Sequence, residues 1–184
     1  MGESSDLRCP TQFGPFQFEM AVEVADDDTK LTSCSSLLSG PIVVTEKLDG
    51  NVRVIAVDLL PMDALPSVEF IQGDFTSDEV LGELREAVGD ARADLVISDM
   101  APNISGQRAV DQPRSMYLVE LALDFCRECL APGGDFVCKV FQGEGTDEFI
   151  AEAKRAFERV KVLKPKASRT GSREVYLVAR NYRL

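Results

Sequence analysis

Residues 93–106 have the sequence ADLVISDMAPNISG, in which a short apolar run ends at an acid and then a loop. A run of this kind, bounded by turn-forming residues, is typical of a strand buried on both faces of a sheet. The loop that follows contains Asp99, a Pro-Asn pair and Gly106. Ligands in open α/β sheets bind beyond the carboxyl ends of the strands. The stretch therefore indicates an ordinary turn or the rim of an active site.

The segments on either side alternate between strand-like and helix-like patterns. The predicted strands are residues 52–60, 68–74, 93–99, 135–143 and 173–182, and the predicted helices are residues 77–89, 113–131 and 146–160, with Ser77 and Thr146 as expected caps. This order predicts an α/β fold with a doubly wound, mostly parallel sheet. The last strand follows a short basic loop, so we expect it to form an antiparallel hairpin.

The length and composition bound the class of protein. A chain of 184 residues most economically forms one domain with its own hydrophobic core. Apolar residues make up 45% and charged residues 28%, close to the average for globular proteins. We find no apolar run long enough for a membrane span and no pattern of a signal peptide. We therefore expect a cytoplasmic protein without a membrane partner.

The five cysteines are irregularly spaced, and only Cys126 and Cys129 form a CxxC pair. A zinc site needs a second pair of ligands. The chain has no histidine, so that pair would have to come from cysteines or carboxylates. We expect reduced, structural cysteines and no metal.

The net charge of −11 is unevenly distributed. Residues 1–53 contain four Lys or Arg and nine Asp or Glu, whereas residues 161–184 contain seven basic residues and only Glu174 as an acid. Phosphate binding depends on the local field rather than on the total charge. The carboxyl-terminal part could therefore bind RNA, and the acidic amino-terminal part could not.

Three successive predicted strands end at an acid, namely Asp58, Asp74 and Asp99. Each acid alone has an ordinary explanation, because aspartate commonly caps turns and loops. Together at one edge of a sheet they indicate a ligand site. A carboxylate such as Asp58 can accept hydrogen bonds from both hydroxyls of a nucleoside ribose, and an acid one strand further on can accept from an adenine amino group.

Lys139 lies inside an otherwise apolar predicted strand. An internal lysine is seldom buried without a partner, although on an edge strand its side chain can reach solvent. Burial favours the neutral amine, which can act as a general base. Asp99 and Glu174 lie on segments that could flank Lys139 and hold it in place.

Four segments of the chain resemble the FtsJ family of S-adenosylmethionine-dependent ribosomal RNA 2′-O-ribose methyltransferases. They are VIAVDLLPMDALPSVEFIQGDF (54–75), SDMAPNISGQRAVDQPRSMYLVELAL (98–123), LAPGGDFVCKVFQGEG (130–145) and KPKASRTGSREVYLVA (164–179). The resemblance covers residues 52–184 and implies a Rossmann-like methyltransferase sheet. It also implies S-adenosylmethionine as cofactor and ribosomal RNA of the large subunit as partner, with a uridine of 23S RNA as target. We expect a monomer that does not bind DNA.

The resemblance also implies roles for individual residues. Lys139, Asp99 and Glu174 match three members of the family's Lys-Asp-Lys-Glu catalytic tetrad, and Lys139 matches the lysine that takes the proton from the ribose 2′-hydroxyl. Asp58, Asp74 and Asp99 match the acids that contact the methyl donor. Asp58 would hold its ribose and Asp74 its adenine, while Asp99 would lie near its amino acid portion.

The resemblance ends near residue 50. The family pattern begins with an RNA-facing lysine on a helix, followed by a strand and a glycine-rich stretch of the type DLGAAPGGW, and neither is present here. Lys30 and Lys47 have no recognisable family context, and no two glycines are adjacent in residues 1–50. We therefore divide the chain into an atypical segment, residues 1–50, and an incomplete FtsJ-like domain, residues 51–184. We expect this segment to come from a shifted reading frame, a rearrangement or a mis-set gene start, and the alternative is a real replacement that provides a different function.

Three functions follow in order of preference. The first is 2′-O-methylation of RNA, with activity impaired by the missing glycine loop. The second is a catalytically inactive relative that keeps the fold and binds RNA or a protein. The third is an α/β nucleotide-binding protein with another ligand. The glycine loop distinguishes the first two.

Overall fold

The structure is a computed structural model that describes residues 42–48, 51–66, 68–165 and 171–183. The strands are β1 (Ile42–Leu48), β2 (Asn51–Asp58), β3 (Val68–Gln72), β4 (Ala93–Ser98), β5 (Leu130–Phe141), β6 (Phe157–Leu163) and β7 (Glu174–Tyr182). The helices are α1 (Asp78–Val88), the short 3₁₀ helix η1 (Gly89–Ala91), α2 (Arg108–Cys129) and α3 (Thr146–Ala156).

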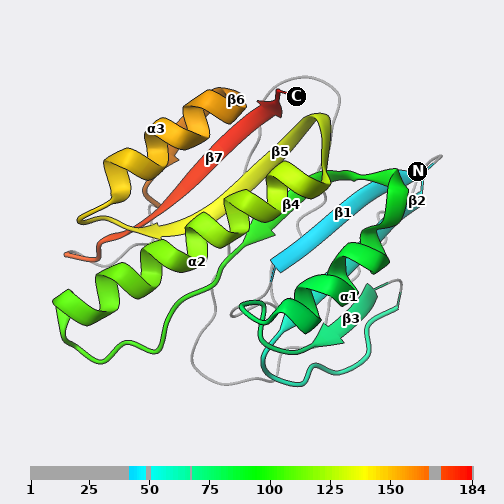
Figure 1. Ribbon diagram of the computed structural model, residues 1–184, viewed down its shortest axis with the longest axis horizontal. Helices are drawn as coiled ribbons and strands as arrows, with labels where there is room; N and C mark the ends of the chain where they lie inside the picture. Colours follow the sequence, from blue (N-terminus) through cyan, green and yellow to red (C-terminus); the bar gives the residue numbers. More distant parts are fainter. Residues whose placement is uncertain (1–41, 49–50, 67, 166–170, 184) are drawn as a thin grey trace, which may run out of the picture. The chain divides into compact units, whose positions relative to one another are not determined.

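The strands form one seven-stranded sheet in the order β3-β2-β1-β4-β5-β7-β6 (Figure 1). β2 pairs with β3 and β4 pairs with β5 in parallel, whereas β1 and β7 are antiparallel to both of their neighbours. Every strand except β1 and β7 therefore runs in one direction. This confirms an α/β fold with an antiparallel hairpin at its carboxyl-terminal end, and the antiparallel β1 makes the sheet more mixed than predicted.

β1 occupies the centre of the sheet in an unexpected direction. Only two residues separate it from β2, so the two strands form a hairpin, with Leu48 opposite Asn51. At the other end of β1, Ile42 pairs with Val57 of β2 and with Ser98 of β4. A strand that delivers a glycine-rich loop to that edge would have to end there, whereas β1 begins there. β1 therefore runs opposite to the first strand that the resemblance implies.

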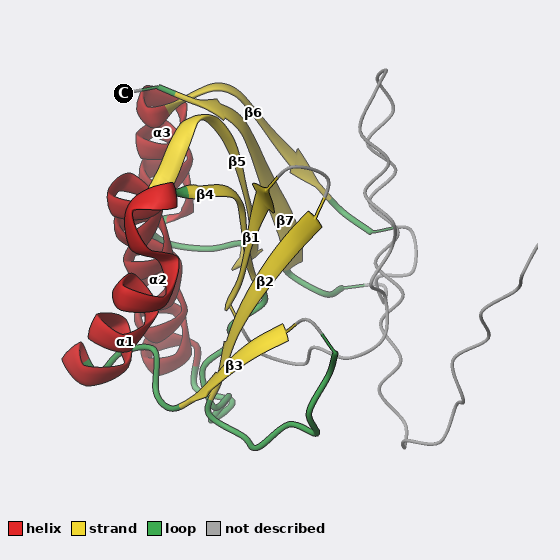
Figure 2. Cartoon of the chain, turned by 90° about the vertical axis from the view of Figure 1, so that its right-hand side faces the viewer, coloured by secondary structure: helices red, strands yellow, loops and turns green. Residues whose placement is uncertain are grey.

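All three α-helices lie against the same face of the sheet (Figure 2). A doubly wound sheet carries helices on both faces, so the described part of the chain corrects that prediction. The physical reason lies in the connections. The β1–β2 hairpin leaves no room for a crossover helix, and residues 59–66, between β2 and β3, contain no helix.

The core lies between the sheet and this helical layer. Phe136 on β5 stacks on Phe157 at the start of β6, with ring centroids 6.2 Å apart, and Phe157 also contacts Tyr182 on β7 at 5.3 Å. Leu84 of α1 and Leu123 of α2 are completely buried. These contacts join β5, β6 and β7 and pack α1 and α2 against the sheet.

Two helices differ from their predicted bounds. α2 begins at Arg108, ahead of the predicted start, and Pro113 lies inside it. α3 ends at Ala156 because the chain turns into strand β6, which pairs with β7. Ser77 caps α1 as predicted, since its hydroxyl accepts from the amide of Val80 at 3.3 Å. Thr146 is not a cap: Gly145 takes that position, and the Thr146 hydroxyl accepts from the amide of Gly143.

Three of the cysteines, Cys126, Cys129 and Cys138, are buried and unpaired in disulfides. Burial raises the pKa of each of these thiols, which disfavours the reactive thiolate. This agrees with reduced, structural cysteines at these positions, whereas Cys9 and Cys34 lie outside the described residues. Among the helices that the structure describes, none is both long enough and apolar enough to cross a membrane.

Candidate active site

The three predicted acids lie at one edge of the sheet. Asp58 ends β2, Asp74 follows the end of β3, and Asp99 directly follows β4. These strands run in the same direction, so their carboxyl ends meet at the same edge. The amide of Gly73 donates to the carbonyl oxygen of Asp58 at 2.9 Å and ties the ends of β2 and β3 together.

Asp58 and Asp74 each stabilise their own turn. Oδ1 of Asp58 accepts from the amide of Leu60 at 2.9 Å. Oδ1 of Asp74 accepts from the amide and the hydroxyl of Thr76, at 2.9 and 2.7 Å. For each acid, stabilisation of its own turn therefore accounts for one carboxylate oxygen, Oδ1. These contacts use Oδ1 alone, and a carboxylate has two oxygens that can accept hydrogen bonds.

Lys139 and Asp99 form an ion pair, with Nζ 3.0 Å from Oδ1. The side chains are only 14% and 24% exposed, respectively. The structure thus brings together two of the three residues that match the catalytic tetrad. The sheet explains the contact, because β5 lies beside β4 in parallel and Lys139 stands one residue beyond Cys138, the partner of Ser98.

Glu174, the third matching residue, lies on the adjacent strand. β7 pairs with β5 so that Tyr176 is opposite Lys139 and Glu174 is opposite Phe141. Glu174 and Lys139 are therefore diagonal neighbours on the same face of the sheet, a distance that long side chains can span. In the described structure, the carboxylate of Glu174 contacts the hydroxyl of Ser172 at 3.4 Å. The sheet places Glu174 beside the ion pair without direct contact.

Tyr176 is a site residue that the sequence analysis missed. Its hydroxyl donates to Oδ1 of Asp99 at 3.2 Å, on the same oxygen that faces Lys139. Burial raises the pKa of Tyr176, and the negative charge of Asp99 raises it further, so the phenol stays protonated and remains a donor. The alternation of REVYLVAR would have placed Tyr176 on the same face as Glu174, but only the register shows that it reaches Asp99.

Asp111, also missed, organises the loop between β4 and α2. Its Oδ1 accepts from the amide and the hydroxyl of Ser105, at 2.9 and 2.8 Å, and its Oδ2 accepts from the amide of Gly106 at 3.0 Å. The hydrogen bonds from Ser105 and Gly106 lower the pKa of Asp111 below its usual value. Asp111 therefore fixes the loop that begins at Asp99.

This anchor predicts a pH-dependent loop. A carboxyl whose pKa falls on folding contributes stability that is complete above its unfolded value, about 3.9, and that is lost as the pH falls through the folded value. We expect the amides of Ser105 and Gly106 to be protected from hydrogen exchange at pH 6 and to lose this protection below about pH 4. Asp111→Ala should accelerate their exchange about tenfold or more at pH 6, because both amides lose a charged acceptor.

Hydrogen exchange measured by mass spectrometry or NMR tests this prediction. Asp124→Ala is a matched control, because Asp124 lies on the same helix and pairs with Arg127 instead of with the loop. Unchanged protection of the loop in Asp111→Ala would show that other contacts hold it.

Comparison with known proteins agrees with this geometry. The model of the FtsJ-like methyltransferase family matches residues 40–182, so the chain belongs to this family. A solved structure from Plasmodium falciparum, which carries the provisional name of a ribosomal RNA methyltransferase, is 30% identical, with a TM-score of 0.61. That match covers 70% of this chain and 71% of the Plasmodium chain. The sheet is thus of the Rossmann-like methyltransferase type.

A second solved structure is more distant. A protein of Streptococcus mutans, provisionally named a methyltransferase and solved in complex with SAH, is 15% identical, with a TM-score of 0.44. That match covers 70% of this chain and 71% of the Streptococcus chain.

Proposed function

We propose that this protein is an S-adenosylmethionine-dependent methyltransferase that modifies the 2′-hydroxyl of a ribose in ribosomal RNA. One observation carries the proposal: Lys139, Asp99 and Tyr176 form a partly buried cluster at the same sheet edge as Asp58 and Asp74. Membership of the FtsJ-like family and the similarity to the Plasmodium protein support RNA as the substrate. We propose a uridine of 23S RNA in the large subunit as the target.

The residues present fit the nucleoside part of the methyl donor. Asp58 and Asp74 supply carboxylate oxygens at adjacent strand ends, which suits ribose hydroxyls and an adenine amino group. Leu59 and Leu60, directly after Asp58, are 64% and 63% exposed and offer an apolar surface for a base. We propose that Asp58 holds the ribose, that Asp74 holds the adenine, and that Asp99 lies near the amino acid portion.

The donor would supply an electrophilic methyl group on a sulfonium. For transfer to oxygen, the ribose 2′-hydroxyl has to lose its proton, and Lys139 Nζ is positioned to accept it in the neutral form. Asp99 holds Nζ in place at 3.0 Å, and the Tyr176 hydroxyl holds the carboxylate of Asp99. Glu174, two pairs further along the β5–β7 ladder, would stabilise the lysine after it has taken the proton.

The direction of β1 argues for impaired activity. Backbone amides of a glycine-rich loop would contact the donor between the ends of β2 and β4, but here the chain enters β1 at that place. We propose that residues 1–50 replace the start of a complete domain and that residues 51–184 retain the remainder. We also propose that the protein is a cytoplasmic monomer.

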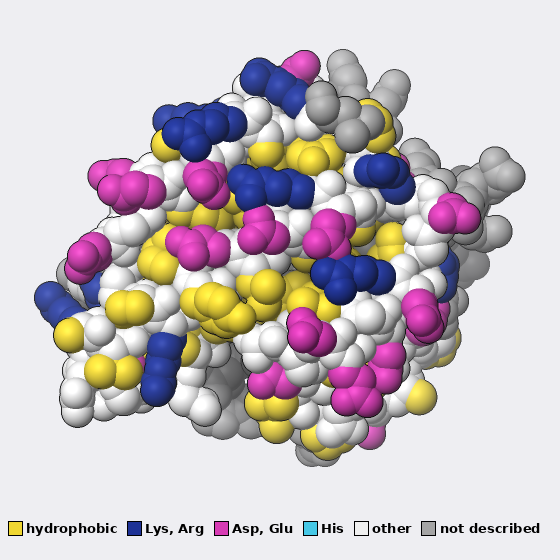
Figure 3. Space-filling view, viewed as in Figure 1, with side chains coloured by type: hydrophobic (Ala, Val, Ile, Leu, Met, Phe, Trp, Pro, Cys, Tyr) yellow, Lys and Arg dark blue, Asp and Glu magenta, His cyan; other side chains and the backbone are white. Residues whose placement is uncertain are grey.

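The RNA surface should lie at the same edge of the sheet. Arg108 and Arg114 are exposed in the first turns of α2, and Lys164 donates to the carbonyl oxygen of Ser172 beside β7. The helical face is unsuited to this role, because basic and acidic side chains are interspersed over it (Figure 3). The connection between β6 and β7 contains two further basic residues, Lys166 and Arg169, which lie outside the described residues.

Charge reversal tests this surface. Changing Lys164, Lys166 and Arg169 to Glu should weaken RNA binding and reduce the slope of log affinity against log salt by about three units. The physical reason is that each phosphate contact releases counterions from the RNA. Fluorescence anisotropy of a labelled RNA between low and moderate salt measures both quantities.

The matched control changes Lys154, Arg155 and Arg159 to Glu. Lys154 and Arg155 lie in the last turn of α3, and Arg159 lies near the start of β6, away from Lys164 at its other end. An unchanged affinity and salt slope in the first variant, or equal losses in both, would show that the RNA surface lies elsewhere.

A catalytically inactive relative that binds RNA or a protein is the second candidate. The antiparallel β1 favours it, because the strand excludes the usual route for a donor loop. The deciding experiment is methyl incorporation from radiolabelled S-adenosylmethionine into large-subunit RNA, followed by nuclease digestion to identify a 2′-O-methylated uridine. Binding of RNA without incorporation at any enzyme concentration would establish the second candidate.

A further inference from the structure

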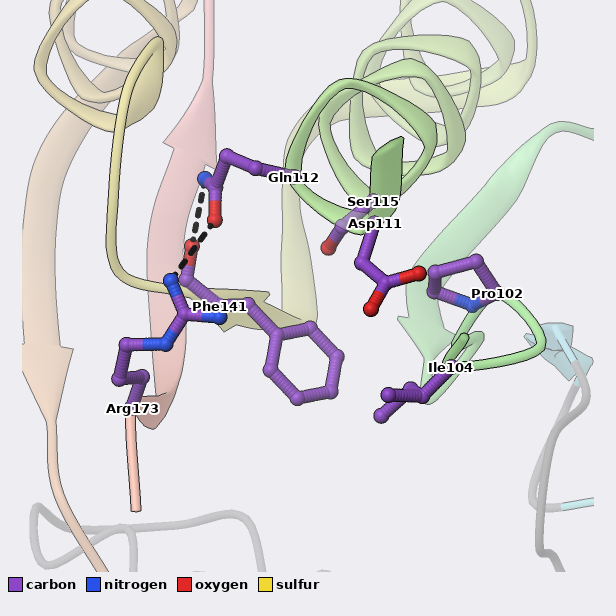
Figure 4. A pocket seen from close by; sticks show the side chains of 7 residues that line it. All are labelled: Pro102, Ile104, Asp111, Gln112, Ser115, Phe141 and Arg173. Carbon is purple, nitrogen blue, oxygen red and sulfur yellow. Dashed lines mark hydrogen bonds between the residues drawn. The ribbon is translucent and has the colours of Figure 1, made fainter. Parts of the chain in front are cut away.

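A small pocket opens at the carboxyl edge of the sheet (Figure 4). The loop after β4 forms one side with Pro102 and Ile104, and the first turns of α2 form another. Phe141 at the end of β5 and Arg173 before β7 complete the lining. The pocket is small and open to solvent on one side, and the centre of a water-sized molecule can occupy about 30 Å³ of it.

The pocket presents an aromatic ring to this space. Phe141 is partly exposed, and its ring lies between the Gln112–Arg173 pair and the loop of Pro102 and Ile104 (Figure 4). Ile104 is 65% exposed. Aromatic and apolar walls of this kind suit a flat ligand such as a nucleobase.

One buried polar side chain of the pocket has no hydrogen-bond partner among the described residues. Ser115 is 4% exposed, lines the pocket, and makes no side-chain hydrogen bond within the part of the chain that the structure describes. Its neighbours are already engaged. Gln112 Nε2 donates to the carbonyl oxygens of Phe141 and Glu144, at 3.1 and 3.0 Å, and Gln112 Oε1 accepts from Arg173 Nη1 at 3.3 Å. A buried hydroxyl without a partner is costly, so a ligand atom would satisfy it.

The spacing connects this pocket to the catalytic lysine. Phe141 and Lys139 are two residues apart on β5, so they project from the same face, about 7 Å apart. A nucleoside whose 2′-hydroxyl lies at Lys139 could therefore place its base against Phe141. Arg173 uses Nη1 in its contacts with Gln112 and with the carbonyl oxygen of Gln142, and a guanidinium has further N–H donors for a phosphate.

We propose that this pocket binds the base of the nucleotide that is methylated. Phe141 stacks on the base, the Ser115 hydroxyl bonds to its polar edge, and Arg173 contacts the adjoining phosphate. The assignment rests on the proposed function, since it places the ribose of the same nucleotide at Lys139.

The absence of tryptophan from the chain allows a direct test. In Phe141→Trp, the new side chain is the only tryptophan and keeps an aromatic surface for stacking. We expect an eight-residue oligouridylate to quench its fluorescence, and an abasic ribose-phosphate oligomer of equal length to leave it unchanged. Tyr117→Trp is the control, because Tyr117 is exposed on α2 and does not line the pocket.

Affinity provides the second measurement, with the same oligouridylate carrying a fluorescent label. Phe141→Ala should weaken binding by about 5- to 150-fold, the range for loss of one stacked base. Ser115→Ala should weaken it by a few-fold, the effect of one neutral hydrogen bond. Thermal unfolding of each variant verifies that the fold is intact.

The outcomes separate the pocket from the reaction. If the Phe141→Trp variant bound oligouridylate without quenching of its tryptophan fluorescence, or if the abasic oligomer quenched it equally, the base pocket would be overturned whether or not the chain methylates RNA. Methylation that is unaffected by Phe141→Ala would overturn it while leaving the proposed function intact. Quenching together with weaker binding in Phe141→Ala would support it even if the chain transfers no methyl group.

Discussion

Lys139→Ala is expected to lower methyl transfer to RNA by about 10²- to 10⁴-fold, the usual contribution of a positioned general base. The structure gives the reason, because Nζ of Lys139 is held 3.0 Å from Asp99 in a partly buried position beside Tyr176. Lys139→Arg should fail as well, although it keeps the positive charge, because a guanidinium does not lose its proton in a protein. Radiolabelled methyl incorporation under single-turnover conditions measures both variants.

Two controls make this result specific to the base. Lys154→Ala removes an exposed lysine from α3 and should leave the rate unchanged. Binding of S-adenosylhomocysteine should be the same in Lys139→Ala as in the unaltered chain, because Asp58 and Asp74 remain. Robust methylation by Lys139→Ala, in a folded protein, would contradict the assigned role of Lys139.

The double variant Asp58→Ala, Asp74→Ala is expected to bind the donor at least about 10²-fold more weakly. Hydrogen bonds to a charged group contribute about 1.5–3 kcal/mol each, and each substitution removes such an acceptor. Both acids also stabilise their own turns, through Leu60 and through Thr76, so the turns have to be checked by hydrogen exchange. Calorimetry with S-adenosylhomocysteine, which cannot react, measures the affinity without catalysis.

The matched control is Asp63→Ala, Asp90→Ala, which removes the same charge from two exposed positions. Asp63 lies in the connection from β2 to β3, and Asp90 lies in η1, which precedes β4 and is therefore at the opposite end of that strand from Asp99. If the affinity were the same in both double variants, Asp58 and Asp74 would not contact the donor, and the site would have to be placed elsewhere.

Much of the fold could be predicted from the sequence because the information is local. The apolar runs before Asp58, Asp74 and Asp99 correspond to β2, β3 and β4, and each acid lies at the end of its strand or shortly after it. Burial of both faces of a strand demands such runs, and turns at the strand ends favour aspartate. The Lys139–Asp99 contact also follows from parallel neighbours whose ends coincide.

The direction of β1 could not be predicted in this way. PIVVTEK has the composition of a strand, but composition does not determine whether a strand runs with or against its neighbours. β6 shows the same limit. Phe157 and Val160 are spaced as in a helix, yet they lie in a strand because β7 offers a free edge with which to pair. Non-local pairing decided both elements.

The sequence by itself determined the α/β class of the fold and the edge of the sheet at which the acids gather, and it singled out an internal lysine. Only the tertiary structure decided which groups surround that lysine. Tyr176 reaches Asp99 from a strand 77 residues away in the chain, and Asp111 fixes the loop through hydrogen bonds that no sequence pattern indicates. The reason is physical. Periodicity records which face of an element is buried, whereas a hydrogen bond depends on the register and separation of two elements that pack together.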